Sequence, residues 1–180
     1  GLREVAFSGD GQTFAVRAGK EVDLFDTASG TRRKTLTLTA EAVYQITLGR
    51  DASLMTVLSG AQGRGADLLL LDTGTGVVRW QKRAAYYGHA LIHPDGSRVI
   101  ASSGGAARYC WVFDAADGRE ISQFPVYAMC QALHPDGKSV AIGTQQGEVV
   151  LVSTSTGAVL QQGKLHPGKL QALAWTADGH

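Results

Sequence analysis

The chain has 180 residues, of which 44% are hydrophobic and 18% charged, and its formal net charge is +1. This apolar content excludes an intrinsically disordered chain, and the near-neutral charge argues against a general nucleic-acid binder, which needs a basic face. Purely apolar runs such as 68–71 are far shorter than the roughly 20 residues that cross a bilayer. We therefore expect a folded chain of about one domain, with neither nucleic acid nor membrane as partner.

Two markers repeat along the chain with one period. The first is an apolar run that leads into a turn with aspartate, at Asp10, Asp51, Asp95, Asp136 and Asp178, which are 41, 44, 41 and 42 residues apart. The second is an apolar pair before Asp or Ser and a glycine-ended turn, at 24–30, 70–76, 112–118 and 151–157. Together they predict repeats at about 1–40, 41–85, 86–126 and 127–168, with a fifth beginning at 169–180.

The first repeat illustrates the predicted elements in chain order. A first strand covers 2–8, and a second carries apolar residues four and six positions after Asp10. A third strand ends at Asp26 and a fourth covers 32–38. The residues between the apolar positions are also mostly apolar, so we expect each sheet to be covered on both faces.

The turns and the chain end give three further expectations. An Asp-Gly pair between apolar runs predicts a two-residue hairpin turn with both central residues at positive φ. Ala52 replaces the glycine in one of these turns and should weaken it. Near the end of the chain, 170–176 is expected to form another first strand. No helical periodicity of any length is present.

Four short antiparallel strands in each stretch of about 42 residues are typical of a β-propeller blade. The sequence therefore predicts an all-β fold, a β-propeller of four-stranded antiparallel blades, with about four blades and one extra inner strand. We interpret it as a segment of a seven- or eight-bladed propeller. The rival interpretation is a self-closing ring of four blades, in which the fifth inner strand competes with the first.

The stretches 133–143 and 147–157 resemble the WD40 repeat, which runs as an apolar strand, Ser-Pro-Asp-Gly, further strands, Trp-Asp and Thr-Gly. The similarity extends over essentially the whole chain. The family's tryptophan is replaced by Phe25, Leu71, Phe113 and Val152, so the side-chain tetrad of many WD40 blades is largely absent and apolar packing should take its place. Residues 68–80 are similar to the repeat of quinoprotein (PQQ-type) propellers, where Thr-Gly and Trp close each blade.

The resemblance implies where partners bind. Loops before the first strand and between the second and third strands emerge on one face, and in WD40 proteins that face and the channel mouth commonly bind partners. Tyr and Arg are enriched at interface hot spots. The candidate partner-binding residues are Arg17, Lys20, Arg64, Tyr86, Tyr87, Arg108, Tyr127 and Gln145. The alternative is that they are ordinary loop residues.

Other reactive side chains have structural interpretations. His93 and His134 share one column of the repeat and are expected to be turn residues in neighbouring blades, and His166 matches the family's structural histidine. Cys110 and Cys130 are expected to be buried free thiols. Cationic residues on the fourth strands should protect exposed sheet edges. We find no catalytic motif, metal-ligand spacing or cofactor motif.

The leading functional hypothesis is a non-catalytic, WD40-like scaffold, not an enzyme, that presents its loop face and channel mouth to a protein or peptide partner. Further blades of the same chain are also expected as partners. The alternatives are the substrate- or cofactor-binding part of a quinoprotein-like or other propeller enzyme, or an accessory propeller of a regulatory enzyme such as a kinase. No cofactor is expected, and a cytoplasmic location is the default.

Overall fold

The computed structural model describes residues 4–40, 42–60, 65–85, 87–103, 109–176 and 178–179. Within these residues, sixteen strands form four sheets of four strands each. The first two sheets consist of β1 (Glu4–Phe7), β2 (Thr13–Ala18), β3 (Glu21–Asp26), β4 (Arg32–Thr37), β5 (Val43–Leu48), β6 (Leu54–Gly60), β7 (Ala66–Asp72) and β8 (Val78–Ala84). The other two consist of β9 (His89–Ile92), β10 (Arg98–Ser102), β11 (Cys110–Asp114), β12 (Glu120–Phe124), β13 (Cys130–Leu133), β14 (Ser139–Gly143), β15 (Glu148–Ser153) and β16 (Val159–Lys164).

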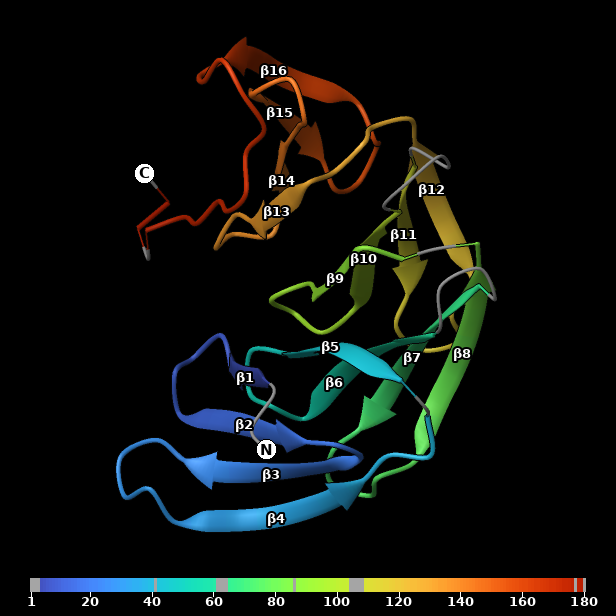
Figure 1. Cartoon of the computed structure of the whole chain (residues 1–180), viewed down its shortest axis with the longest axis vertical. Helices are drawn as coiled ribbons and strands as arrows, with labels where there is room; N and C mark the ends of the chain where they lie inside the picture. The colour runs from blue at the N-terminus through green and yellow to red at the C-terminus, as the bar shows by residue number, and fades with distance from the viewer. Residues whose placement is uncertain are drawn as a thin grey trace.

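Each sheet is an antiparallel meander in chain order, with its first strand innermost and its fourth strand outermost. The four sheets follow one another around an open arc, as propeller blades do (Figure 1). The described residues include no helix, and none therefore that is long and apolar enough to span a membrane. The prediction of an all-β fold with four-stranded antiparallel blades is confirmed.

Neighbouring sheets pack face to face through three apolar clusters. Leu24 and Leu36 of the first sheet meet Met55 and Leu69 of the second in one of them. The other two clusters lie between the second and third sheets and between the third and fourth.

Every residue of β14 is buried. Val140 and Ile142 belong to the cluster shared with the third sheet, and Leu170, in the chain after β16, lies beside Gly143. The expected coverage of both sheet faces is confirmed for the second and third sheets, which each pack on two neighbours, whereas one face of the first sheet is uncovered and Phe7 on it is 61% exposed.

The turn between β1 and β2 differs from the prediction at one residue. Gly11 has φ +70°, but Asp10 is not among the residues with positive φ, so a two-residue turn with two left-handed residues is wrong. The Gly11 N–H donates to Ser8 O at 2.9 Å, and the Asp10 carboxylate accepts the Gln12 N–H at 2.9 Å. This is a four-residue turn closed by a left-handed glycine. Ala52 has φ +59° at the corresponding position, a conformation that L-residues rarely adopt.

The chain after β16 also departs from the prediction. Residues 170–176 form no strand, since no described strand pairs with them and a strand requires a hydrogen-bonded neighbour. They nevertheless lie beside the fourth sheet, because the Trp175 indole N–H donates to Ala132 O at 3.1 Å. The Trp175 ring also meets His134 edge-on, with centroids 4.7 Å apart. The expected inner strand is therefore absent from the described structure, and 170–176 lies beside the fourth sheet as irregular chain.

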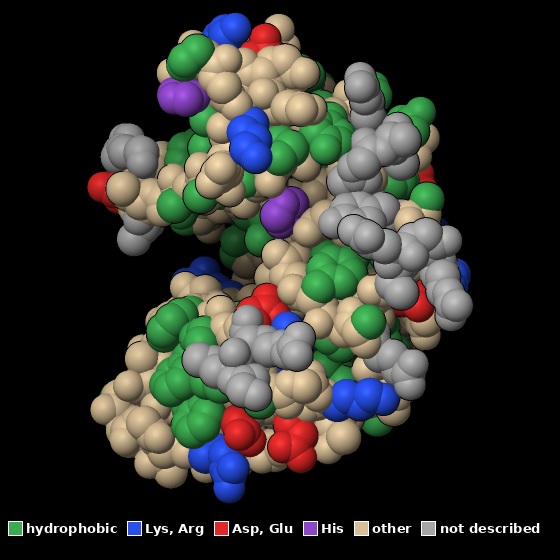
Figure 2. All heavy atoms as spheres, in the orientation of Figure 1, with side chains coloured by type: hydrophobic (Ala, Val, Ile, Leu, Met, Phe, Trp, Pro, Cys, Tyr) green, Lys and Arg blue, Asp and Glu red, His purple; other side chains and the backbone are tan. Residues whose placement is uncertain are grey.

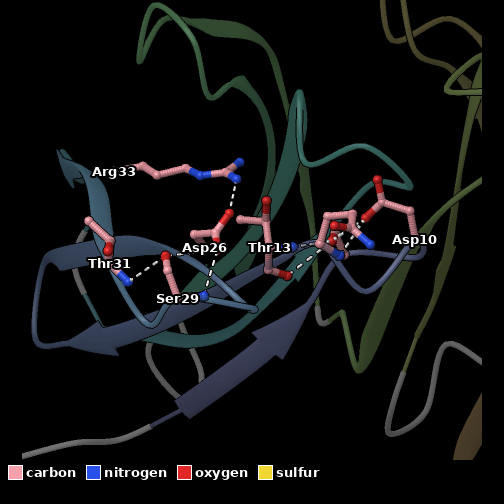
Figure 3. A network of polar contacts seen from close by, with 8 residues as sticks. Asp10, Thr13, Asp26, Ser29, Thr31 and Arg33 are labelled. Carbon is pink, nitrogen blue, oxygen red and sulfur yellow. Dashed lines mark hydrogen bonds and ion pairs between the residues drawn. The ribbon is translucent and has the colours of Figure 1, made fainter.

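A register shift recurs where the third and fourth strands pair, at the same column in all four sheets. In the first two sheets it leaves Arg33 and Arg79 without a cross-strand partner, and such bulges redirect side chains. Arg33 pairs with Asp26 (Figure 3), and Arg79 lies 3.0 Å from Asp72. Arginines of the predicted cationic fourth strands are thus ion-paired with the aspartates that end the third strands.

These strand-ending aspartates also close the turn to the fourth strand. Asp26 Oδ1 accepts the N–H and the hydroxyl of Ser29, and the Ser29 hydroxyl accepts the Thr31 N–H (Figure 3). Asp72 repeats the arrangement with Thr75. Hydrogen bonds from the Thr75 N–H, Arg79 and the Thr75 hydroxyl lower the pKa of Asp72 to about 2. Ionised aspartate is therefore part of the blade architecture.

The turns between first and second strands hold their aspartates in the same way. Burial tends to raise the pKa of Asp95, but hydrogen bonds from Ser97 and His93 outweigh it and lower the value to about 2. The pKa values of Asp10, Asp26, Asp51 and Asp136 are also lowered. A depressed folded-state pKa means that the carboxylate stabilises the fold above its unfolded value of 3.8 and loses that contribution as the pH falls.

We therefore expect the melting temperature to fall steeply as the pH is lowered from about 4 to about 2, where these aspartates become protonated. Thermal unfolding followed by circular dichroism at several pH values measures this. Asp72→Asn removes one of the groups concerned, so its melting temperature should fall less than that of the wild type over the same interval. Parallel profiles for the two proteins would contradict a role for Asp72 ionisation.

Both cysteines are free and buried, as predicted. Cys110 is fully buried in the cluster between the third and fourth sheets, and burial raises the pKa of its thiol to about 12. Burial also raises the pKa of Cys130. Neither thiol is a reactive thiolate at neutral pH.

Candidate functional site

The loop face is the end of the sheets at which the connections between second and third strands and the segments between sheets emerge. Its described parts include 18–20, 38–40, 85, 87–88, 125–129 and 144–147. The opposite end, the turn face, carries the aspartate turns. The described candidate partner-binding residues, which are Arg17, Lys20, Tyr87, Tyr127 and Gln145, belong to connections or strand ends at the loop face. The surface as a whole is hollowed on the inner side of the arc, between the first and fourth sheets (Figure 2).

The first strands are joined to one another by side chains six positions before each turn aspartate. Each of three such side chains hydrogen-bonds to the backbone of the next sheet's first strand or the residue before it. The pairs are Glu4 Oε1 with the Ile46 N–H at 3.0 Å, Gln45 Oε1 with the Ala90 N–H at 3.0 Å and His89 Nε2 with Met129 O at 2.9 Å. These bonds position the loop face by fixing how consecutive sheets meet.

Arg17 belongs to this framework. It lies directly opposite Glu4 in the β1–β2 pairing, and its Nε donates to Glu4 Oε2 at 3.1 Å. Its Nη1 donates to Gly19 O at 3.3 Å, and the residue is only 4% exposed. A guanidinium that is buried and paired in this way braces the sheet. The structure thus places Arg17 beneath the surface, where it does not present its charge to a partner.

Lys20 is exposed in the turn between β2 and β3, and its carbonyl accepts the Leu38 N–H at 2.8 Å. It lines a cavity of about 180 Å³ with Arg17, Ala40, Ala42 and Val43. The cavity lies between the first sheet and the segment that leads to the second. Arg17 and Lys20 are therefore the two candidate residues that one described cavity brings together.

Tyr87 is 2% exposed and packs between the second and third sheets. Its ring meets Trp111 edge-on, with centroids 5.6 Å apart, and its carbonyl accepts the Tyr44 hydroxyl at 2.6 Å. Burial, together with the negative charges of Asp67 and Glu120, raises the pKa of Tyr87 to about 12. Its side chain is a core residue in this structure and does not belong to the loop-face surface.

The remaining candidates divide into two groups. Tyr127 is half-buried and Gln145 is exposed, and both belong to the loop face near the fourth sheet. Arg64, Tyr86 and Arg108 lie outside the described residues. Tyr127 and Gln145 line neither of the two described loop-face cavities, so the described candidates are spread over the face.

A second cavity on the loop face involves residues that the sequence did not single out. It has a volume of about 420 Å³ and adjoins the first through Ala40 and Ala42. Ser59, Asp67 and Arg83 line it from β6, β7 and β8, where the three residues are cross-strand neighbours. The sequence gives one signal for this cavity. Asp67 places a carboxylate directly before the buried run Leu68–Leu71, where apolar residues are the norm.

On the turn face, His93 and His134 link neighbouring sheets, in agreement with their structural interpretation. His93 Nε2 donates to Gly137 O at 2.9 Å, while its Nδ1 lies 2.6 Å from Asp95. His134 makes the corresponding contacts with Gly179 O at 3.3 Å and Asp136 at 2.6 Å. A cavity of about 630 Å³ lies on this face among Leu48, Ile92, Leu133 and Trp175, at the inner ends of the sheets.

Trp80, the residue behind the quinoprotein-like resemblance, packs between the second and third sheets. It is 7% exposed, and its indole N–H donates to Ala115 O at 3.1 Å. Among the described residues, no group of three or more His, Cys, Asp or Glu side chains is arranged to hold a metal ion.

Comparison with known proteins gives one partial relative. No family model matches the chain. A segment of 96 residues is 31% identical to the probable U3 small nucleolar RNA-associated protein 18 of Schizosaccharomyces pombe (strain 972 / ATCC 24843). The match covers 50% of this chain and 18% of that relative, so the chain spans less than a fifth of the relative's length. This similarity agrees with the WD40-like interpretation of the sequence.

Proposed function

We propose that this chain is part of a non-catalytic, WD40-like propeller scaffold that binds a protein partner through its loop face. The observation that carries the proposal is the pair of adjoining cavities at this face, of about 180 and 420 Å³, on a framework of braced first strands. Binding residues on loops that a rigid scaffold positions are a common arrangement. Lys20, Tyr127 and Gln145 are the described candidates that remain at the surface.

The uncovered face of the first sheet supports the proposal that further blades of the same chain are partners. In the first sheet, Phe7, Phe14 and Phe25 form an aromatic row, and Phe7 is 61% exposed. The third-sheet residues of the same columns, Ile92, Val99 and Phe113, are buried against the second sheet. We propose that another blade of the same chain covers the aromatic row.

The relative's name associates it with the U3 small nucleolar RNA. A direct RNA site in this chain would require a basic surface. On the face viewed in Figure 2, the described Lys and Arg side chains lie in separate spots among acidic and neutral ones. We therefore propose a protein as the direct partner, within whatever larger assembly contains it.

Reversing the charges of Arg64 and Arg108 together, as Arg64→Glu and Arg108→Glu, is expected to reduce partner capture severalfold at an unchanged melting temperature. Both residues belong to loops that the sequence assigns to the loop face, and charged interface residues chiefly affect association and specificity. Quantitative co-purification of the tagged full-length protein from cells, followed by mass spectrometry, measures capture.

The matched control reverses two exposed charges of the turn face, with Arg119→Glu and Lys138→Glu, and should leave capture unchanged. Ribonuclease treatment of the captured material should also leave it unchanged if the contact is protein to protein. Capture that persists in the loop-face variant, or that disappears with ribonuclease, would contradict the proposal.

A further inference from the structure

The outer edge of the fourth sheet differs from the outer edges of the other sheets. β16 is the last strand of its sheet, at the rim of the arc (Figure 1), and no described strand pairs with its free side. All of its residues are exposed, whereas β4, β8 and β12 each bury one residue. An edge strand presents unpaired N–H and C=O groups, which make it a template for pairing with another strand.

The outer strands also differ in the charges that protect their edges. β4 and β8 each contain three Lys or Arg residues and β12 contains Glu120, whereas 159–163 of β16 are uncharged. Charged residues on an edge oppose pairing with another strand. The bulge residue of β16 is Leu160, in the column where the first two sheets hold the ion-paired Arg33 and Arg79. β16 therefore lacks the protection that these strands have.

Apolar side chains gather along this uncharged edge. Val159 is 53% exposed, Leu160 is 57% exposed, and Leu165, directly after the strand, is 73% exposed. A further blade would not cover Leu160, because Arg33 and Arg79 in its column stay exposed although another sheet follows each of theirs. Grouped exposed apolar side chains are typical of interaction surfaces. The edge of β16 is therefore a candidate contact surface whatever follows the fourth sheet.

The charges of the outer strands decide how each would pair with its own copy. Antiparallel pairing of β8 about its central residue, Gln81, would place Arg79 of each copy opposite Arg83 of the other. Like charges that face each other across two strands are destabilising. The one charge of β16 is Lys164, and antiparallel pairing about any of 159–163 places it opposite a neutral residue. β16 can therefore pair with β16 of a second copy without charge repulsion.

We propose that this chain forms a dimer in which β16 pairs antiparallel with β16 of a second copy, with Gln162 at the two-fold axis. This register places Val159 of each copy opposite Leu165 of the other, so that exposed apolar side chains meet at both ends of the contact. Such a self-complementary patch is what a two-fold dimer requires. The contact is separate from the residues that line the two loop-face cavities, so the inference goes beyond the proposed function.

Sedimentation velocity of the purified protein over a range of concentrations measures this dimer. The wild type should show a concentration-dependent equilibrium between monomer and dimer. Val159→Lys together with Leu165→Lys places like charges at both ends of the contact and should raise the dissociation constant about tenfold or more. The matched control, Val77→Lys with Gln123→Lys, changes two exposed residues outside β16 and should leave the equilibrium unchanged.

A cysteine at the two-fold axis tests the register. Gln162→Cys should give a disulfide-linked dimer on mild oxidation, because residues directly opposite in an antiparallel pair have Cα atoms about 4.5–5.5 Å apart, within reach of a disulfide. Gln123→Cys, at the exposed position of the same column in β12, should not. The two native thiols are buried and do not interfere.

Thermal unfolding verifies that every variant is folded. The proposal is overturned if the wild type stays monomeric at all concentrations or if the two lysines in the contact leave the dissociation constant unchanged. It is also overturned if Gln162→Cys crosslinks no better than Gln123→Cys.

Discussion

Replacing Phe113 by alanine will lower the free energy of unfolding of the 180-residue chain by about 3–5 kcal/mol, the usual cost of removing a buried phenylalanine. Phe113 is 4% exposed and lies in the cluster between the second and third sheets. Its ring lies 6.0 Å from that of Trp80, whose indole is anchored to Ala115 O. Truncation leaves a cavity beside this aromatic pair. Urea unfolding followed by fluorescence measures the loss.

Phe25 is the matched control, because it occupies the same column of the repeat in the first sheet. It stacks on Phe14 at 5.0 Å but is only half-buried, since no described sheet covers that face. Phe25→Ala should therefore cost about 1 kcal/mol, most of it from the lost stacking. Equal losses for the two variants would contradict the assignment of Phe113 to an interface between blades.

Replacing Gly137 by alanine will lower the free energy of unfolding by about 2–5 kcal/mol. The residue has φ +75°, which costs an L-residue about 1–2 kcal/mol. A methyl group there would also overlap the His93 ring, and overpacking typically adds about 1–3 kcal/mol. The shift would disturb the bond from His93 Nε2 to Gly137 O that links the third and fourth sheets.

Gly11 occupies the same position in the first turn, with φ +70° and open space where a methyl group would lie. Gly11→Ala should therefore cost only the conformational term, about 1–2 kcal/mol. Thermal and urea unfolding of both variants separate the two contributions. If Gly11→Ala lowers the free energy of unfolding as much as Gly137→Ala does, the contact with His93 contributes nothing to the packing of the third sheet on the fourth.

The repeat in the sequence predicted the strands well, because the period places apolar residues and turn glycines at fixed offsets. The left-handed Gly11, the Ala52 turn and the cationic fourth strands all follow from local sequence. The irregular chain at 170–176 did not follow, since a strand depends on a partner strand and not on the apolar pattern alone.

The site was harder to predict, because its geometry depends on contacts between sheets. Arg17 was expected at the surface, yet its register opposite Glu4 buries it. The column that joins the first strands holds Glu4, Gln45 and His89, three residue types without a common motif. The cavity beside Ser59, Asp67 and Arg83 became visible only when the cross-strand register was known.

Crosslinking of the co-purified complex with a lysine-reactive reagent, followed by mass spectrometry, tests the central claim most directly. Lys20 lies in the β2–β3 turn of the loop face, and Lys138 lies in the β13–β14 turn of the opposite face with 84% of its side chain exposed. The account predicts crosslinks from the partner to Lys20 and none to Lys138. Crosslinks that concentrate on Lys138 instead would contradict it.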